Sequence, residues 1–87
     1  MNTFSLTVSS PDGDIFKERV VSLSLQGANG DLAVLAGHIP FVTTLRPGNC
    51  KIELEDGSVK TGRVESGLLS VSPDGVTVLS SDLTLDE

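Results

Sequence analysis

The feature that most constrains the fold of this chain is a repeated alternation of apolar and polar side chains with a period of two residues. It is clearest in residues 4–9, 21–26 and 50–55, where Phe, Val, Leu, Ile and Cys alternate with Ser, Thr, Gln, Lys and Glu. Successive side chains of a β-strand point to opposite faces of a sheet. Each segment therefore predicts a half-buried strand with one face on a core and the other in solvent.

Four further segments, at residues 32–35, 41–45, 68–71 and 76–79, are shorter and more continuously apolar. This pattern predicts strands that lie deeper in the core than the alternating ones. The sequence shows no apolar stripe with the 3.6-residue period of an amphipathic helix, no internal repeat and no low-complexity tract.

Turn-forming residues separate these segments at close and regular spacing. They are Pro11-Asp12-Gly13, residues 27–30, Pro47-Gly48, Asp56-Gly57 and Pro73-Asp74-Gly75. Asp-Gly favours a type I′ hairpin, because both central residues of that turn need positive φ, so we expect one at Asp56-Gly57. We likewise expect a hairpin at Pro73-Asp74-Gly75 that links residues 68–71 to residues 76–79. Short strands at this spacing predict an all-β sandwich or barrel.

Length and composition limit the classes of function. Eighty-seven residues form one domain with a thin core. With a net charge of −6 and no basic stripe, the chain is not expected to bind nucleic acid or an anionic membrane surface. No apolar run is long enough to cross a bilayer. The single cysteine, Cys50, excludes an internal disulfide and fits a reducing compartment.

Few residues could carry chemistry. Around His38, the single histidine, the sequence supplies neither the partners of a general base nor the ligands of a zinc site. A Gly-rich phosphate loop followed by Lys is absent as well. We therefore expect no enzymatic activity, no metal and no cofactor.

Two other functions compete with a structural role. One is an unrelated β-sandwich module that binds a peptide or sugar, although the chain has no Trp or Tyr. The other is a small hydrolase or isomerase, which would need two convergent titratable groups.

A series of short motifs resembles the epsilon subunit of rotary F-type ATP synthases. The strongest match combines Gly-Asp-Leu at 30–32, Gly-His-Ile-Pro at 37–40, Thr43 and Arg-Pro-Gly at 46–48. Weaker matches lie in residues 4–21 and 65–79, in the family's order and at its spacing. The resemblance therefore covers nearly the whole chain.

This resemblance implies a flattened β-sandwich or barrel of about ten short, mainly antiparallel strands. It implies a non-catalytic rotor subunit of the central stalk that links the gamma subunit to the membrane c ring and couples ion translocation to ATP synthesis. Ser10, His38 and Thr43 match positions that face gamma, and Asp31 matches the loop that meets the c ring. The implied location is the cytoplasmic side of the bacterial plasma membrane, as a peripheral part of the complex, with a chloroplast or another energy-transducing membrane as the alternative.

The last residues break the strand pattern. Cap-type residues followed by acids at 81–87 predict the beginning of a helix. The resemblance implies a β-sandwich domain at residues 1–82 and, at 83–87, the stub of a missing C-terminal helical hairpin. In the family, that hairpin restrains ATP hydrolysis and in some members binds ATP. Leu85-Asp86-Glu87 resembles the start of the ATP-binding motif, but the rest of that motif is absent from the sequence. We therefore expect no ATP binding by this chain.

Overall fold

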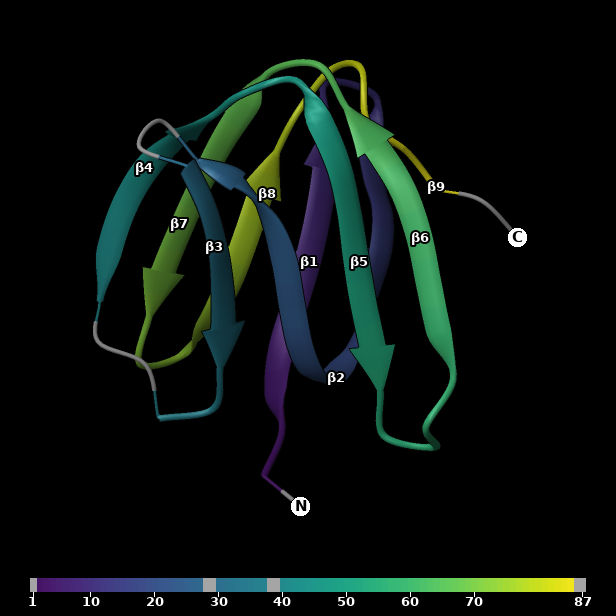
Figure 1. Ribbon diagram of the computed structural model, residues 1–87, viewed down its shortest axis with the longest axis vertical. Helices are drawn as coiled ribbons and strands as arrows, with labels where there is room; N and C mark the ends of the chain where they lie inside the picture. The colour runs from purple at the N-terminus through teal and green to yellow at the C-terminus, as the bar shows by residue number, and fades with distance from the viewer. Residues whose placement is uncertain (1, 28–29, 38–39, 86–87) are drawn as a thin grey trace.

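The computed structural model describes residues 2–27, 30–37 and 40–85, and within them the chain forms nine β-strands and no helix (Figure 1). The strands are β1 (Phe4–Ser10), β2 (Gly13–Gly27), β3 (Gly30–Leu35), β4 (Phe41–Leu45), β5 (Gly48–Leu54), β6 (Val59–Val64), β7 (Gly67–Ser72), β8 (Gly75–Leu79) and β9 (Thr84–Leu85). The predicted all-β fold of short, mainly antiparallel strands is confirmed.

The strands form two facing layers (Figure 1). Layer A contains β4, β7, β8, β1 and the N-terminal half of β2, paired in that order. Layer B contains β3, the C-terminal half of β2, β5, β6 and β9. Among the described strands, β1 and β8 form a parallel pair and the other pairs are antiparallel. The 15-residue strand β2 thus joins the two layers.

A bulge lets β2 serve both layers. The register between β2 and β5 shifts between Val20 and Ser22. Val20 is buried before the shift, and Leu23 and Leu25 are buried after it. One extra residue in a strand reverses which alternate side chains face the core. The sequence alternation predicts Val21 in the core, and this is wrong: the bulge places Val20 there and leaves Val21 half-buried.

The core lies between the two layers and is almost entirely aliphatic. Leu69 from layer A and Leu23 from layer B are among its fully buried side chains. Cys50, Ile52 and Leu54 are buried on one side of β5, as their alternation predicts. Each buried Leu, Ile or Val side chain contributes about 1.5–3 kcal/mol of hydrophobic free energy.

The four continuously apolar segments do not lie deeper than the other strands, so that prediction is wrong. Val34 and Val78 are buried, but their neighbours Leu35 and Leu79 are 56% and 47% exposed, and Val42 is 62% exposed. Each of these strands has the core on one face only, as expected in a two-layer sandwich. Their outward apolar side chains therefore lie on the surface of the molecule.

Two turns of identical sequence, Ser-Pro-Asp-Gly, connect β1 to β2 and β7 to β8. The hydroxyl of Ser10 donates to the carbonyl oxygen of Gly13 at 3.1 Å, and that of Ser72 donates to the carbonyl oxygen of Gly75 at 3.0 Å. Pro at the second position and Gly at the fourth suit a type I turn. The predicted hairpin at 73–75 is confirmed.

The turn between β5 and β6 differs from the predicted type I′ hairpin. The backbone amide of Gly57 donates to the carbonyl of Leu54, and the amide of Leu54 donates to the carbonyl of Ser58. Gly57 has a φ of 89°, whereas no described residue other than glycine has positive φ. Asp56 therefore cannot occupy a type I′ position, and the loop has three residues with glycine last, the geometry of a G1 bulge.

The C-terminal residues complete the edge of layer B instead of beginning a helix. Leu83 is buried in the core, and Thr84 and Leu85 pair with Arg63 and Gly62 of β6. A side chain at Gly62 would overlap the carbonyl oxygen of Thr84, so glycine is what lets β9 approach. The helix predicted from residue 81 is therefore wrong for Thr84 and Leu85. Asp86 and Glu87 lie outside the described residues, and the division of the chain at residue 82 stays a prediction.

Candidate interaction surfaces

The outward side of layer A carries an uncharged face. It follows from the register of β1, β8, β7 and β4, which places side chains in two rows that cross the four strands. The rows are Thr44, Leu68, Leu79 and Ser9, and Val42, Ser70, Thr77 and Thr7. These eight residues define the uncharged face. Charged side chains resume only on β2, where Asp14 pairs with Ser9 and Lys17 pairs with Thr7.

The outward side of layer B carries a charged face. Asp31 on β3, Lys51 and Glu53 on β5 and Arg63 on β6 define it, together with the polar residues between them. Arg63 and Glu65 form an exposed ion pair at 2.8 Å. The hydroxyl of Ser22 donates to Glu53 at 3.5 Å. Exposed pairs of this kind contribute little to stability, so this face is suited to water or to a polar partner.

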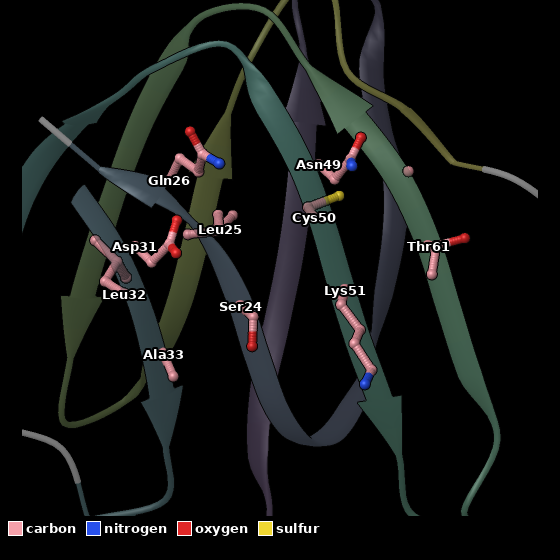
Figure 2. Close-up of a pocket in the computed structure, with 11 residues that line it drawn as sticks. Ser24, Leu25, Gln26, Asp31, Leu32, Ala33, Asn49, Cys50, Lys51 and Thr61 are labelled. Atoms are coloured by element: carbon pink, nitrogen blue, oxygen red, sulfur yellow. The ribbon is translucent and has the colours of Figure 1, made fainter.

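A groove of about 700 Å³ crosses the charged face where β2 and β5 diverge (Figure 2). Ser24 is the last β2 residue paired with β5, and further along β2 the carbonyl of Gln26 accepts the amide of Arg46 instead. Leu25 and Cys50, both buried core residues, form the floor of the groove where the two strands separate. Figure 2 shows Asp31 on the β3 side, and Lys51 and Thr61 on the opposite side. The groove therefore combines an apolar floor with a charged rim.

A second hollow, of about 480 Å³, lies at one end of the uncharged face. We call it the socket. Its lining comes from the ends of β1 and β8 and the start of β7, and consists of Ser9, Ser10, Pro11, Ser66, Gly67, Leu68, Leu79, Ser80 and Ser81. No charged side chain is among these described residues.

The site residues expected from the sequence fall in different parts of the molecule. Ser10 lines the socket. Thr43 lies on β4, half-buried, on the side of the strand that also carries buried Leu45. Strand β4 lies three strand spacings, about 14 Å, from the strand that carries Ser10. The side chain of Thr43 does not belong to the uncharged face. Asp31 lies in the groove of layer B. His38 lies outside the described residues.

Sequence reasoning missed the residues that dominate the uncharged face, among them Val42, Leu68 and Leu79. The signal was present, because Leu68 and Leu79 each stand next to a buried residue in a short apolar segment, and Val42 stands next to half-buried Thr43. Applying period two to those segments, instead of taking them as doubly buried, would have placed these side chains on an outer face.

Within residues 2–27, 30–37 and 40–85, no three His, Cys, Asp or Glu side chains come close enough to hold a metal ion. In the same part of the chain, no helix is long and apolar enough to span a membrane.

The fold defines the class of the domain, a small β-sandwich with one uncharged and one charged outer face, but it does not by itself define a role. The sequence assigns it more narrowly: residues 3–85 match the family described as the ATP synthase delta/epsilon chain, β-sandwich domain, and the chain belongs to this family. The resemblance to the epsilon subunit is thereby confirmed. The chain is a domain of a non-catalytic subunit, and the family match decides against an unrelated binding module and against a small enzyme.

Two solved structures have similar folds. One is from the mitochondrial ATP synthase of Euglena gracilis, described as OSCP, F1 and c ring, with a TM-score of 0.88 and 27% identity over 95% of this chain. The other is from the central stalk and c ring of the Tetrahymena thermophila mitochondrial ATP synthase, with a TM-score of 0.74 and 17% identity over 92% of this chain. This chain spans 53% and 64% of the length of those two chains.

Proposed function

We propose that this domain is a rotor element of an F-type ATP synthase that joins the gamma subunit to the c ring in the central stalk. The family match supports this role, and so does the origin of the similar Euglena chain, a structure of OSCP, F1 and c ring. The domain neither binds nor hydrolyses ATP. It couples ion translocation to ATP synthesis by holding its two neighbours in fixed relative positions.

The observation that carries the proposal is the uncharged face. The chain has 18 charged side chains, 6 basic and 12 acidic, and none of them lies in the two rows that cross β1, β8, β7 and β4. A contiguous apolar and hydroxyl-bearing surface without charge is typical of the centre of a protein interface. We assign this face to gamma, with Ser10 at its end. Thr43 then lies at the edge of the interface, on the other side of β4 from Val42 and Thr44.

The charged face suits the second neighbour. Asp31 stands at the rim of the groove on layer B, the side of the sandwich opposite to the uncharged face (Figure 2). A polar rim around an apolar floor fits a polar loop that carries an apolar side chain. We assign this side to the c ring.

The architecture fits a part that transmits torque. The two faces are the outer sides of layers that share strand β2 and one continuous core. A close-packed core has low compressibility, so force applied to one face is transferred to the other with little deformation. This role places the domain at the periphery of an energy-transducing membrane, for which we propose the cytoplasmic side of the bacterial plasma membrane.

The test is a titration of purified gamma with two matched variants. Thr44→Lys places a charge on the uncharged face, and Thr61→Lys places the same charge at another exposed strand position, on the charged face. Burying an unpaired charge in an interface costs several kcal/mol, so Thr44→Lys should weaken gamma binding about 100-fold. Thr61→Lys should bind gamma as the wild type does. Equal affinities for the two variants, both folded, would overturn the assignment of the faces.

A further inference from the structure

The socket at the end of the uncharged face has a floor made by two leucines on adjacent strands. Leu68 on β7 and Leu79 on β8 are directly opposite in the register and are 37% and 47% exposed. Pro11 adds apolar surface from the β1–β2 turn. The floor continues into the uncharged face, because Leu68 and Leu79 also belong to one of its rows.

Four of the five serine hydroxyls that line the socket, those of Ser9, Ser10, Ser66 and Ser80, form hydrogen bonds within the domain. Ser9 donates to Asp14 at 2.6 Å, Ser10 donates to the carbonyl of Gly13, and Ser80 lies 2.6 Å from the carbonyl oxygen of Ser66. A hydroxyl whose proton is already used offers a ligand mainly its carbon surface and its remaining lone pairs. The socket is therefore poorly suited to an anion or to another hydrogen-bond acceptor.

The walls are held in place by a network around Asp82. Its carboxylate accepts hydrogen bonds from the backbone amide and hydroxyl of Ser66, both at 3.2 Å, and from the hydroxyl of Ser80 at 2.9 Å. The backbone amide of Ser80 donates to the carbonyl of Ser9 at 3.0 Å, which links β8 to β1. The hollow is thus formed before any partner binds, and preorganisation reduces the entropy lost on association.

We propose that the socket receives one aliphatic side chain of the chain that covers the uncharged face, as an anchor of that interface. This proposal rests on the proposed function, in which gamma is that chain. The chemistry of the lining argues for such an occupant: an apolar floor, internally bonded hydroxyls and no charge. Anchors that fill a preformed pocket dominate the binding energy of many interfaces.

The experiment measures the dissociation constant of purified gamma for a set of variants that differ at one leucine. Leu79→Ala empties the floor, Leu79→Asn keeps its approximate volume but makes it polar, and Leu79→Met keeps it apolar. Leu35→Ala is the matched control, because Leu35 is a leucine of similar exposure, 56%, on layer B. Thermal unfolding checks that each variant is folded.

We expect Leu79→Ala and Leu79→Asn to weaken binding about tenfold or more, because such a loss defines an anchor residue. Leu79→Met and Leu35→Ala should stay within about twofold of wild type, since Met adapts to apolar pockets. Wild-type affinity for Leu79→Asn would overturn the aliphatic occupant. Wild-type affinity for Leu79→Ala, with Thr44→Lys still impaired, would overturn the socket and leave the assignment of the face intact. Wild-type affinity for both Leu79→Ala and Thr44→Lys would overturn both proposals.

Discussion

The two outer faces of this domain have the same backbone architecture but different surfaces. Both present exposed aliphatic side chains: Leu68 and Leu79 on the uncharged face, Leu35 and Val59 on the outer side of layer B. Apolar exposure alone therefore does not distinguish them. The faces differ in the side chains that stand between the apolar residues. On the charged face these include charged residues such as Lys51, whereas the rows of the uncharged face contain none.

This difference carries information because folding does not require it. A strand in a two-layer sandwich needs apolar side chains on its inner face only, and charges on the outer face help to prevent edge-to-edge aggregation. A chain with a net charge of −6 that nevertheless keeps four adjacent strands free of outward charge leaves a surface suited to burial against another protein. The contrast between the faces thus points to a partner where the fold alone does not.

Both faces depend on one feature, the bulge in β2, and removing it gives the largest effect that we predict. Deleting Val21 would leave Val20, Leu23 and Leu25 in regular alternation on the inner face of β2, but it would remove the extra twist and bend by which the strand passes from layer A to layer B. The two layers could then no longer pack both of their inner faces against one core. We expect a loss of about 5 kcal/mol or more, comparable with the whole free energy of unfolding of a small domain. Circular dichroism and thermal unfolding should show no cooperative transition.

Val21→Ala is the control for this deletion, since it keeps the bulge and removes only two methyl groups from a half-buried side chain. It should lower the free energy of unfolding by about 1 kcal/mol. A deletion variant that melts as cooperatively as Val21→Ala would mean that β2 can pass between the two layers without the bulge.

The bulge also shows which features of the fold could be predicted from the sequence. Period two in residues 4–9 and 50–55 predicted strands with the correct inner face, and the Pro-Asp-Gly hairpin at 73–75 was predicted correctly. The bulge at Val21 was missed, because the apolar pair Val20-Val21 fits either register. Likewise, Thr84-Leu85 has acids and cap-type residues around it, and only its contact with Gly62 makes it a strand.

The candidate surfaces were harder to predict than the fold. Asp31 and Ser10 came from a family resemblance, and the structure places them at a groove and a socket that no local pattern indicates. A hollow is formed by strands that are distant in the sequence, such as β1 and β7, so its lining cannot be recognised before the strand order is known. The uncharged face likewise cannot be recognised before the strand order is known, because its rows combine residues from four strands.

An intermediate effect should come from the Asp82 network at the end of the uncharged face. The hydroxyl of Ser80, followed by the backbone amide of Ser66, holds the pKa of Asp82 below its ordinary value of 3.8. A carboxylate whose pKa falls on folding stabilises the native state above its unfolded pKa, and this stability is lost as the pH falls through the folded pKa. Asp82→Ala should therefore melt at a lower temperature than wild type at pH 7.

The difference in melting temperature between Asp82→Ala and wild type should narrow as the pH falls below about 3.8, where wild type itself begins to lose the contribution. Ser80→Ala, which removes the main donor, should show a weaker pH dependence than wild type over the same range. Differential scanning calorimetry from pH 7 to the acid limit of folding measures both. A difference that stays constant with pH would show that the network does not depend on the ionised carboxylate.

The smallest effect should come from the charged face. The guanidinium of Arg63 and the carboxylate of Glu65 are 2.8 Å apart, but the two side chains are 54% and 52% exposed. Water and salt screen such a pair, and holding two long side chains in one geometry costs conformational entropy. Arg63→Ala should therefore change the free energy of unfolding by about 0.5 kcal/mol or less in urea titrations, with no change in affinity for gamma. A larger loss of stability would mean that Arg63, whose backbone pairs with Thr84, helps to hold β9 against β6. In that case the charges of this face would be part of what closes the sandwich, and the two faces would differ in their contribution to folding as well as in their partners.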